Sequence, residues 1–485
     1  MLAVRRVAFP LAMLCANVCA QSPGPEVKKF IAYDDAVIAL THVRVIDGTG
    51  APAQDNRTLV LRDGKIESIG DAAPPAGARV IDLSGHSVMP GLVGMHNHLM
   101  YTASINLDED GKIPPPGFLV TELAFSAPRL YLASGVTTMR TTGSIEPYAD
   151  LNIRRLIDEM KMPGPHIDVT GPYLEGKDSS FPQLAAITSP EQATKTVAFW
   201  VSQGATSFKA YMNIAEGVLG AAIKEAHKHG LKLTGHLCSV TYPEAVALGI
   251  DNLEHGFFVN TQLDPGKQPD KCSDGTGTPT LLKMTPGSPE ANALIKLLVD
   301  HHVAVTSTLP VFAQSVPLHE PLQPRQMDVM TPQAKEAYLF SRNLTASRAG
   351  TQRAKDFDQA YKNDLGLERQ FVASGGLLIA GPDPTGNGGT IPGFADQREL
   401  ELLVEAGFSP VEAIKIGTLN GATYLGLADR IGTIAAGKNA DLFIVKGNPA
   451  ANINDVENVI VVFKDGVGYD SAKLLQSVKG RFGQY

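Results

Sequence analysis

Apolar and polar positions follow one pattern near the two ends of the chain and another in the middle. Residues 37–88 contain short apolar segments separated by turn sequences such as Asp47-Gly48 and Asp63-Gly64, which predicts β-strands. The closing residues repeat this pattern, with Asp465-Gly466 as one of the turns. We therefore expect one small β-domain assembled from both ends of the chain. The expected strands are 37–40, 43–46, 58–62, 65–69 and 79–82 on the N-terminal side, and 432–434, 441–445, 459–464 and 467 on the C-terminal side.

The middle region, about 89–425, alternates short apolar runs with helical stretches such as 216–229 and 288–301. This alternation is typical of a parallel sheet whose strands are connected by helices, and eight such units predict a (β/α)8 barrel. The expected barrel strands are 91–96, 136–140, 166–170, 206–209, 232–236, 252–255, 303–308 and 377–381.

The predicted fold class is therefore α/β, a (β/α)8 TIM barrel with a small β-sandwich domain built from both chain ends. The expected division is a signal peptide at 1–20, the N-terminal part of the β-sandwich at 21–88, the barrel at 89–428 and the C-terminal part of the β-sandwich at 429–485.

The first twenty residues have the pattern of an export signal. Arg5 and Arg6 precede an apolar run at 7–18, and small residues precede Gln21, where cleavage is expected. The sequence thus predicts an exported bacterial protein, periplasmic or secreted. A buried N-terminal helix is the alternative, and Cys19 leaves a lipoprotein open.

The composition of the chain argues against nucleic acids and membranes as binding partners. The chain of 485 residues is 44% hydrophobic and 19% charged, with a formal net charge of −8. Nucleic-acid binding requires a clustered basic face, and the sequence gives no indication of one. The apolar run at 7–18 is too short for a confident membrane span, so we expect no stable span once the signal is removed.

Four cysteines occur, of which only Cys238 and Cys272 remain after cleavage of the signal. An oxidising compartment permits a disulfide between them, but sequence spacing does not show whether they meet. For Cys238 we favour the role of a small buried apolar residue.

The candidate chemistry begins with His96 and His98, two residues apart at the end of a predicted strand. Residues i and i+2 of a strand point to the same face, so both imidazoles can reach one metal ion. Alone, two histidines with ordinary hydrogen-bond partners would explain this pair better. Four further polar residues, however, stand at the ends of later predicted strands. They are Lys209, His236, His255 and Asp383.

Each of these residues alone has an ordinary explanation, such as a salt-bridged lysine at the rim or a helix N-cap. Together they form a set of nitrogen and oxygen ligands without cysteine. Such a set suits a divalent metal ion, with Zn²⁺ preferred and Mn²⁺, Co²⁺ or Fe²⁺ as alternatives.

With these motifs in place, the sequence resembles the amidohydrolase superfamily. The similarity extends from about residue 37 to 467, and within the superfamily it is greatest to imidazolonepropionase-like enzymes and to metal-dependent dipeptidases that cleave Xaa-Pro or Xaa-Arg. The matching positions are Met89-Pro90-Gly91-Leu92, His96, His98, Gly135-Val136-Thr137-Thr138, Lys209, Tyr211, His236, Glu254-His255-Gly256, Asp383, Asn420-Gly421-Ala422-Thr423, and Gly432-Thr433-Ile434 followed by Gly437-Lys438, Ala440-Asp441-Leu442.

The resemblance implies a binuclear centre. One metal would be held by His96, His98 and Asp383, and the other by His236 and His255. Lys209, carboxylated by carbon dioxide to a carbamate, would bridge them together with a hydroxide.

The resemblance also implies a mechanism. The bridging hydroxide would attack the substrate carbonyl, and Asp383 would transfer the proton to the leaving nitrogen. For Tyr211 we expect a contact with the carbonyl oxygen or with a substrate carboxylate.

The predicted function is hydrolysis of an amide bond in a small molecule, a dipeptide or an N-acyl amino acid. A cyclic amide hydrolase, a lactonase or an esterase would use the same centre. A non-catalytic scaffold of the same fold is the alternative outside enzymes, although the full ligand set argues against it. A homo-oligomer is also compatible with the resemblance. We interpret the long loops 99–117, 260–286 and 310–366 as substrate lids, with disorder as the alternative for the middle of 260–286.

Overall fold

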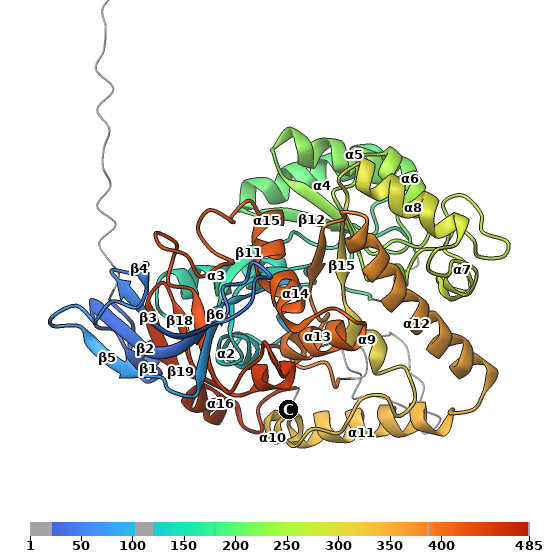
Figure 1. Ribbon diagram of the computed structural model, residues 1–485. Helices are drawn as coiled ribbons and strands as arrows, with labels where there is room; N and C mark the ends of the chain where they lie inside the picture. The colour runs from blue at the N-terminus through green and yellow to red at the C-terminus, as the bar shows by residue number, and fades with distance from the viewer. Residues whose placement is uncertain (1–21, 102–119, 178, 180, 386–387, 484–485) are drawn as a thin grey trace, which may run out of the picture.

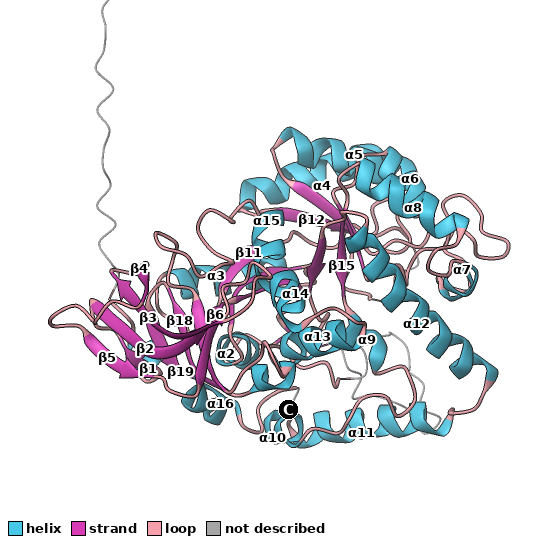
Figure 2. Cartoon of the chain, viewed as in Figure 1, coloured by secondary structure: helices cyan, strands magenta, loops and turns pink. Residues whose placement is uncertain are grey.

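The structure is a computed structural model (Figure 1) that describes residues 22–101, 120–177, 179, 181–385 and 388–483. The predicted signal peptide 1–20 and most of the predicted lid 99–117 lie outside the described residues. Within the described part, the strands of the two chain ends form one sheet, and the strands of the middle region form a barrel with helices around it (Figure 2).

The sheet at the chain ends has nine strands, and strands from the two termini lie side by side in it. β6 and β17 pair in antiparallel register from Pro90 opposite Leu442 to His86 opposite Lys446, so the two termini hold each other in place. A separate apolar core lies under this sheet, with Leu40, Leu59 and Phe463 fully buried. The strands are β1 (Ile31–Tyr33), β2 (Val37–Val45), β3 (Gln54–Arg62), β4 (Lys65–Gly70), β5 (Arg79–Asp82), β6 (His86–Pro90), β17 (Leu442–Lys446), β18 (Val459–Lys464) and β19 (Val467–Asp470).

The prediction for these ends was wrong at one segment. Residues 432–434 were expected to form a strand but lie in a bend, where Gly432 has a φ of 85°. A Cβ atom at Gly432 would lie 2.7 Å from the Cβ of Ala422, so this turn packs directly against the helix that contains Ala422. Two strands, β1 and β6, were not predicted.

The barrel contains all eight predicted strands, with their ends displaced by one residue at most. β7, β10 and β11 pair in parallel, and β12 to β16 pair in parallel in chain order. The strands are β7 (Leu92–Asn97), β10 (Val136–Thr141), β11 (His166–Val169), β12 (Ser207–Ala210), β13 (Lys232–Gly235), β14 (Asn252–Glu254), β15 (Ala304–Ser307) and β16 (Leu378–Ala380).

Backbone hydrogen bonds close the barrel at two places. Between β11 and β12, the amide of Thr206 donates to the carbonyl of Val169 at 2.8 Å. Between the last strand and the first, the amide of Asp383 donates to the carbonyl of His96 at 2.9 Å. The closure therefore places the end of β16 directly beside the end of β7.

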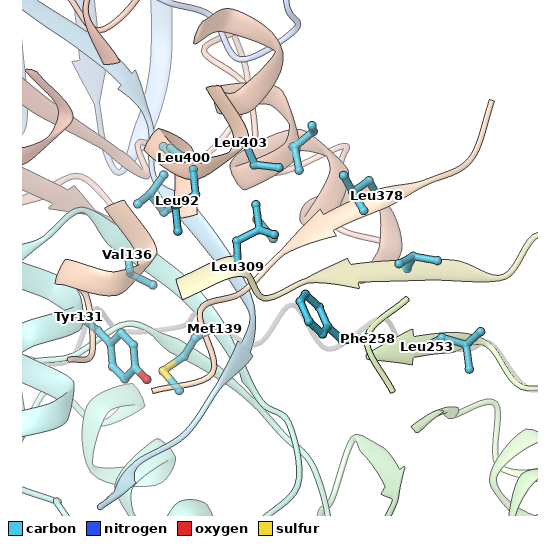
Figure 3. Close-up of a cluster of buried hydrophobic side chains, with 14 of the residues drawn as sticks. Leu92, Tyr131, Val136, Met139, Leu253, Phe258, Leu309, Leu378, Leu400 and Leu403 are labelled. Atoms are coloured by element: carbon cyan, nitrogen blue, oxygen red, sulfur yellow. The ribbon is translucent and has the colours of Figure 1, made fainter. Parts of the chain in front are cut away.

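Helices surround the barrel and bury its apolar outer side chains. Figure 3 shows part of this core, with Leu92 of β7, Val136 of β10 and Leu378 of β16 packed near Leu400 and Leu403. The helices with a place in the barrel wall are α2 (Ser126–Ala133), α3 (Pro147–Asp158), α4 (Pro190–Gln203), α5 (Glu216–Lys228), α6 (Tyr242–Ala247), α8 (Pro289–Asp300), α12 (Gln352–Ala373), α13 (Phe394–Glu405) and α14 (Pro410–Lys415).

Shorter elements complete the fold. They are α1 (Pro25–Lys28), the strand pair β8 (Met100–Tyr101) and β9 (Thr121–Glu122), α7 (Thr278–Lys283), α9 (Leu309–Ala313), α10 (Pro324–Val329), α11 (Pro332–Ser347), the π-helical turn η1 (Ile416–Asn420), α15 (Gly421–Tyr424), the 3-10 turn η2 (Ile453–Glu457) and α16 (Ser471–Val478). Among the described residues, no helix is both long enough and apolar enough to cross a membrane.

The segment 260–286 is tied to the barrel by a disulfide between Cys238 and Cys272. Treating Cys238 as a simple buried apolar residue was therefore wrong. Cys238 follows the end of β13, and its partner lies in the long segment after β14, so the bond joins two loops that the fold brings together. The expected alternative of disorder in the middle of 260–286 also fails, because this segment is described throughout and contains α7.

Candidate metal centre

The structure brings all seven predicted site residues to the carboxyl ends of the barrel strands. In a (β/α)8 barrel this is the face at which active sites form. His96 belongs to β7 with His98 just after it, and Lys209 belongs to β12 with Tyr211 just after it. His236, His255 and Asp383 follow β13, β14 and β16. The metal and catalytic roles assigned to these residues stay predictions.

His96, His98 and Asp383 form the tightest group. Their ligand atoms all lie within 4.8 Å of one another. The Asp383 Oδ1 atom is 3.2 Å from His98 Nε2 and 3.7 Å from His96 Nε2. Ligands at about 2.0–2.2 Å from a tetrahedral Zn²⁺ lie roughly 3.3–3.6 Å apart. The three side chains therefore fit a single metal ion.

Lys209, His236 and His255 lie next to this group. The Lys209 Nζ atom is 3.0 Å from His96 Nε2. The ring centroid of His255 is 4.3 Å from that of His236 and 4.6 Å from that of His96. The Nε2 atom of His255 is buried and has no hydrogen-bond partner among the described residues. A buried nitrogen without a partner is costly in a finished core, and a metal ion at this position would satisfy it.

Hydrogen bonds at the Nδ1 atoms of His96 and His98 leave the Nε2 atom of each ring facing the centre. His96 Nδ1 donates to a carboxylate oxygen of Glu254 at 2.7 Å, and His98 Nδ1 donates to the carbonyl oxygen of Gly143 at 3.2 Å. Since carboxylate and carbonyl oxygens only accept, Nδ1 carries the proton and Nε2 keeps its lone pair. His255 Nδ1 lies 2.9 Å from Thr308 Oγ1 and 3.9 Å from Asp383 Oδ2.

Burial keeps these groups in the form that binds metal. It lowers the pKa of all four histidines, to about 4 for His96 and to about 3 for His236. They are thus neutral imidazoles at neutral pH. Burial also lowers the pKa of Lys209, to about 8, which makes its neutral amine accessible.

Two residues to which the sequence analysis assigned no role, Glu254 and Arg140, support His96. Glu254 is fully buried and accepts a hydrogen bond from the guanidinium of Arg140 at 2.8 Å as well as from His96. Burial alone would raise the pKa of Glu254, but Arg140 and His96 hold it well below its usual range. Arg140 also donates to Asn252 Oδ1 at 2.9 Å. The sequence contained a signal for this arrangement. Asn252 and Glu254 lie two residues apart, and therefore on the same face, of a predicted strand, and a buried carboxylate there requires a cation as its partner.

Tyr173 was also missed. Its hydroxyl lies 3.4 Å from His98 Nε2, and its ring lies 4.8 Å from that of Tyr211, between centroids. Tyr173 follows β11, so its place after a barrel strand was the available signal. Burial raises the pKa of both tyrosines, so both present neutral hydroxyl donors.

Two of the predicted ligands have unusual backbone conformations. His255 has a φ of 70° and Asp383 a φ of 51°, both in the left-handed region that side chains with a Cβ rarely adopt. Such strain persists where the surrounding structure enforces it, and it is concentrated at functional sites.

A second group of possible ligands lies at the opposite ends of the strands. His166, Asp441 and Asp465 come together there, with His166 Nε2 2.9 Å from Asp465 Oδ2. The buried Lys464 lies 3.8 Å from the same oxygen. These contacts form an ion-pair network between the barrel and the β-domain.

A cavity of about 380 Å³ lies above the metal-site residues. Its lining includes Lys209, His236, His255 and Asp383, so these side chains are open to a small molecule.

Comparison with known proteins identifies the family to which the chain belongs. The model of the amidohydrolase family matches residues 87–468, which include the barrel strands and every predicted ligand. The chain belongs to the amidohydrolase family. It is a metal-dependent amidohydrolase, and His96, His98 and Asp383 form its candidate metal site.

Curated amidohydrolase relatives match only parts of the chain. A stretch of 80 residues is 39% identical to imidazolonepropionase from Deinococcus radiodurans and covers 16% of this chain and 19% of that protein. A stretch of 106 residues is 30% identical to dihydroorotase from Pelotomaculum thermopropionicum and covers 22% of this chain and 21% of that protein. The matches thus span about a fifth of these relatives.

Solved amidohydrolase structures match nearly the whole fold. A putative prolidase from Bifidobacterium longum has a TM-score of 0.65 at 24% identity, covering 91% of this chain and 98% of that one. A Xaa-Pro dipeptidase with bound methionine has a TM-score of 0.65 at 20% identity, covering 90% and 100%. The bottromycin amidohydrolase has a TM-score of 0.67 at 20% identity, covering 94% of each. At these identities the likeness establishes the fold.

Proposed function

We propose that this amidohydrolase is an exported, binuclear metal-dependent hydrolase that cleaves the amide bond of a dipeptide or an N-acyl amino acid. The observation that carries the proposal is the convergence of four neutral histidines, one buried lysine and one aspartate at the floor of a small-molecule cavity. The similarity in fold to structures described as prolidases and as a Xaa-Pro dipeptidase supports the dipeptide class.

The residues divide into two ligand sets. His96, His98 and Asp383 would hold one ion, and His236 and His255 the other, with Lys209 between them as a carbamate. Bound divalent ions acidify water and polarise a carbonyl group, which supplies the nucleophile and the electrophile of amide hydrolysis. Zn²⁺ suits this donor set, and Mn²⁺, Co²⁺ or Fe²⁺ are alternatives.

The carbamate of Lys209 rests on its surroundings. The side chain is 1% exposed, and its amine lies 3.0 Å from His96 Nε2 and 5.1 Å from the ring centroid of Tyr173. It forms no salt bridge with a carboxylate among the described residues. A buried ammonium in such a place is unfavourable, whereas a carbamate would be an anion placed between two cations.

Asp383 would move the proton. Its Oδ1 atom lies 3.2 Å from His98 Nε2 and accepts from the hydroxyl of Thr385 at 3.0 Å. We assign Oδ2 to take the proton of the attacking water and to deliver it to the leaving nitrogen. Tyr211 lines the same cavity, and its neutral hydroxyl would donate to the carbonyl oxygen or to a substrate carboxylate.

The proposal of export, to the periplasm or the medium, rests on the first twenty residues. The disulfide between Cys238 and Cys272 supports it, because disulfides persist mainly in oxidising compartments.

The test is hydrolysis of dipeptides and N-acyl amino acids by the metal-loaded protein, with esters and lactones in parallel. Replacing Asp383 by Asn should lower kcat by about 100-fold or more, since the proton carrier is lost. The exposed Asp429 provides the matched Asp→Asn control, which should leave hydrolysis unchanged. Amide hydrolysis that survives Asp383→Asn, or activity on esters alone, would overturn the proposed reaction.

A further inference from the structure

One wall of the cavity is apolar and comes from the long segment after β15. Val311 and Phe312 belong to α9, and Phe357 belongs to α12. These side chains lie outside the motifs that the chain shares with its family.

The wall is held in place by aromatic stacking. Phe312 stacks on the buried Phe258, with centroids 3.9 Å apart and planes at 6°, and Phe258 lies 5.6 Å from Phe357, again between centroids. Phe258 is anchored in the hydrophobic core beside Leu309 (Figure 3). Such stacking fixes the rings before any ligand arrives, so little side-chain entropy is lost on binding.

The wall is also continuous with the metal centre. The ring of Phe312 stands edge-on to that of His255, at 5.6 Å between centroids and an angle of 89°. When the carbonyl group of a substrate amide is bound at the metal centre, one of the two groups that flank the amide therefore lies against these rings.

The charges of the lining residues argue against a carboxylate on the substrate group that contacts the wall. Among the described lining residues, Lys209 is the only lysine, and no arginine is present. Its amine is engaged at the centre, 3.0 Å from His96. A carboxylate placed against Phe312 and Phe357 would be removed from water without a partner, which is strongly unfavourable.

We propose that one of the two groups flanking the scissile amide is bulky, apolar and uncharged, with an aromatic group preferred, and that it binds against Val311, Phe312 and Phe357. This inference rests on the proposed function and specifies its substrate class. It predicts that amides with a phenylalkyl group are better substrates than those with a methyl or a carboxyalkyl group at the same position.

The probes are metal-binding hydroxamates, which are not hydrolysed and so separate binding from turnover. One series is acetohydroxamate, 3-phenylpropionohydroxamate and succinic monohydroxamate. The other is the matching set of N-hydroxyformamides, which place the same groups on the nitrogen side. In at least one series, titration calorimetry on the metal-loaded protein should show the phenyl probe binding about 10-fold or more tightly than the other two.

Variants of the wall test whether these side chains cause the preference for the phenyl probe. Phe357→Ala should lower the preference for the phenyl probe to about 3-fold or less, and Phe357→Leu should retain most of it, because leucine keeps an apolar wall. Phe340→Ala is the matched control, since Phe340 is exposed on α11 and does not line the cavity. The preference of the unaltered protein tests the proposal even if Phe357→Ala fails to fold.

The outcomes separate the two proposals. Binding of the three probes within about 3-fold in both series, or tightest binding of the carboxylate, would overturn the apolar class while leaving amide hydrolysis intact. A preference unchanged in Phe357→Ala would remove the wall as its cause. A protein that binds no metal and no hydroxamate would contradict the proposed function itself.

Discussion

The residues around His96 show how a single side chain is prepared for metal binding. Glu254 fixes the proton on Nδ1, Arg140 neutralises Glu254, and Asn252 helps to hold Arg140. The histidine pair could be predicted because a strand places residues i and i+2 on one face. The pairing of Glu254 with Arg140 was harder to predict, because the two residues come from different strands.

Replacing Glu254 by Gln should weaken metal binding by about 10- to 100-fold, because the partner that orients His96 loses its charge and Arg140 is left buried without a counter-ion. Competition with a chelator followed by metal analysis measures this. Glu191→Gln is the control, since Glu191 is 75% exposed and pairs with Lys195 on α4. Equal metal affinity of the two variants would remove Glu254 from the account.

At the scale of elements, periodicity predicted the barrel strands well and the attachments between elements poorly. Alternating short apolar runs and helices have a strong local signal, and all eight strands were found. The disulfide has no such signal. It depends on where the segment 260–286 lies in space, and one spacing of two cysteines does not determine that.

Breaking the disulfide should destabilise the segment that follows β14. A bond between cysteines 34 residues apart constrains the unfolded chain, and its loss in Cys272→Ser should lower the free energy of unfolding by about 2–4 kcal/mol. Urea unfolding with and without a reducing agent provides the measurement. The reducing agent should destabilise the unaltered protein and leave Cys272→Ser unchanged. An unaltered protein that is insensitive to reduction contradicts this role.

The helix α13 introduces a pH dependence of stability through Glu399. Burial raises the pKa of this carboxyl group to about 8, above the value of about 4.3 expected in an unfolded chain. The folded state therefore binds the proton more tightly. The stability associated with it is complete below about pH 4 and is lost as pH rises to about 8. Glu399→Gln should reduce the fall in unfolding free energy between pH 5 and pH 8, by up to about 1.4 kcal/mol per pH unit.

Chemical denaturation at a series of pH values checks this expectation, with the exposed Glu290→Gln as the control. Identical pH profiles for the Glu399→Gln variant and the unaltered protein would show that the carboxyl group is ionised in the fold.

At the scale of the whole molecule, the metal site depends on the closure of the barrel. His96 and Asp383 lie far apart in the sequence, yet the bond from the amide of Asp383 to the carbonyl of His96 places them together. The order of eight parallel strands predicted this neighbourhood in outline. The close approach at Gly381 could not be predicted, because it depends on the exact packing of β16 against β7.

Gly381→Ala should disturb this closure. A Cβ atom there would lie 2.0 Å from the backbone nitrogen of His96, so the two strand ends must separate. We expect a loss of about 1–3 kcal/mol or more in stability together with weaker metal binding. Gly217→Ala is the control, because a Cβ at this position on α5 meets no atom within 4 Å and alanine favours a helix. Equal stability and metal content in both variants would contradict the closure argument.

The most direct test of the binuclear centre is the metal content of the purified protein after equilibration with Zn²⁺ and removal of loosely bound ions. The account predicts two ions per chain. It predicts one ion in a variant with alanine at both His236 and His255, which would keep His96, His98 and Asp383. A protein that holds no tightly bound metal, or a double variant that still holds two ions, would contradict it.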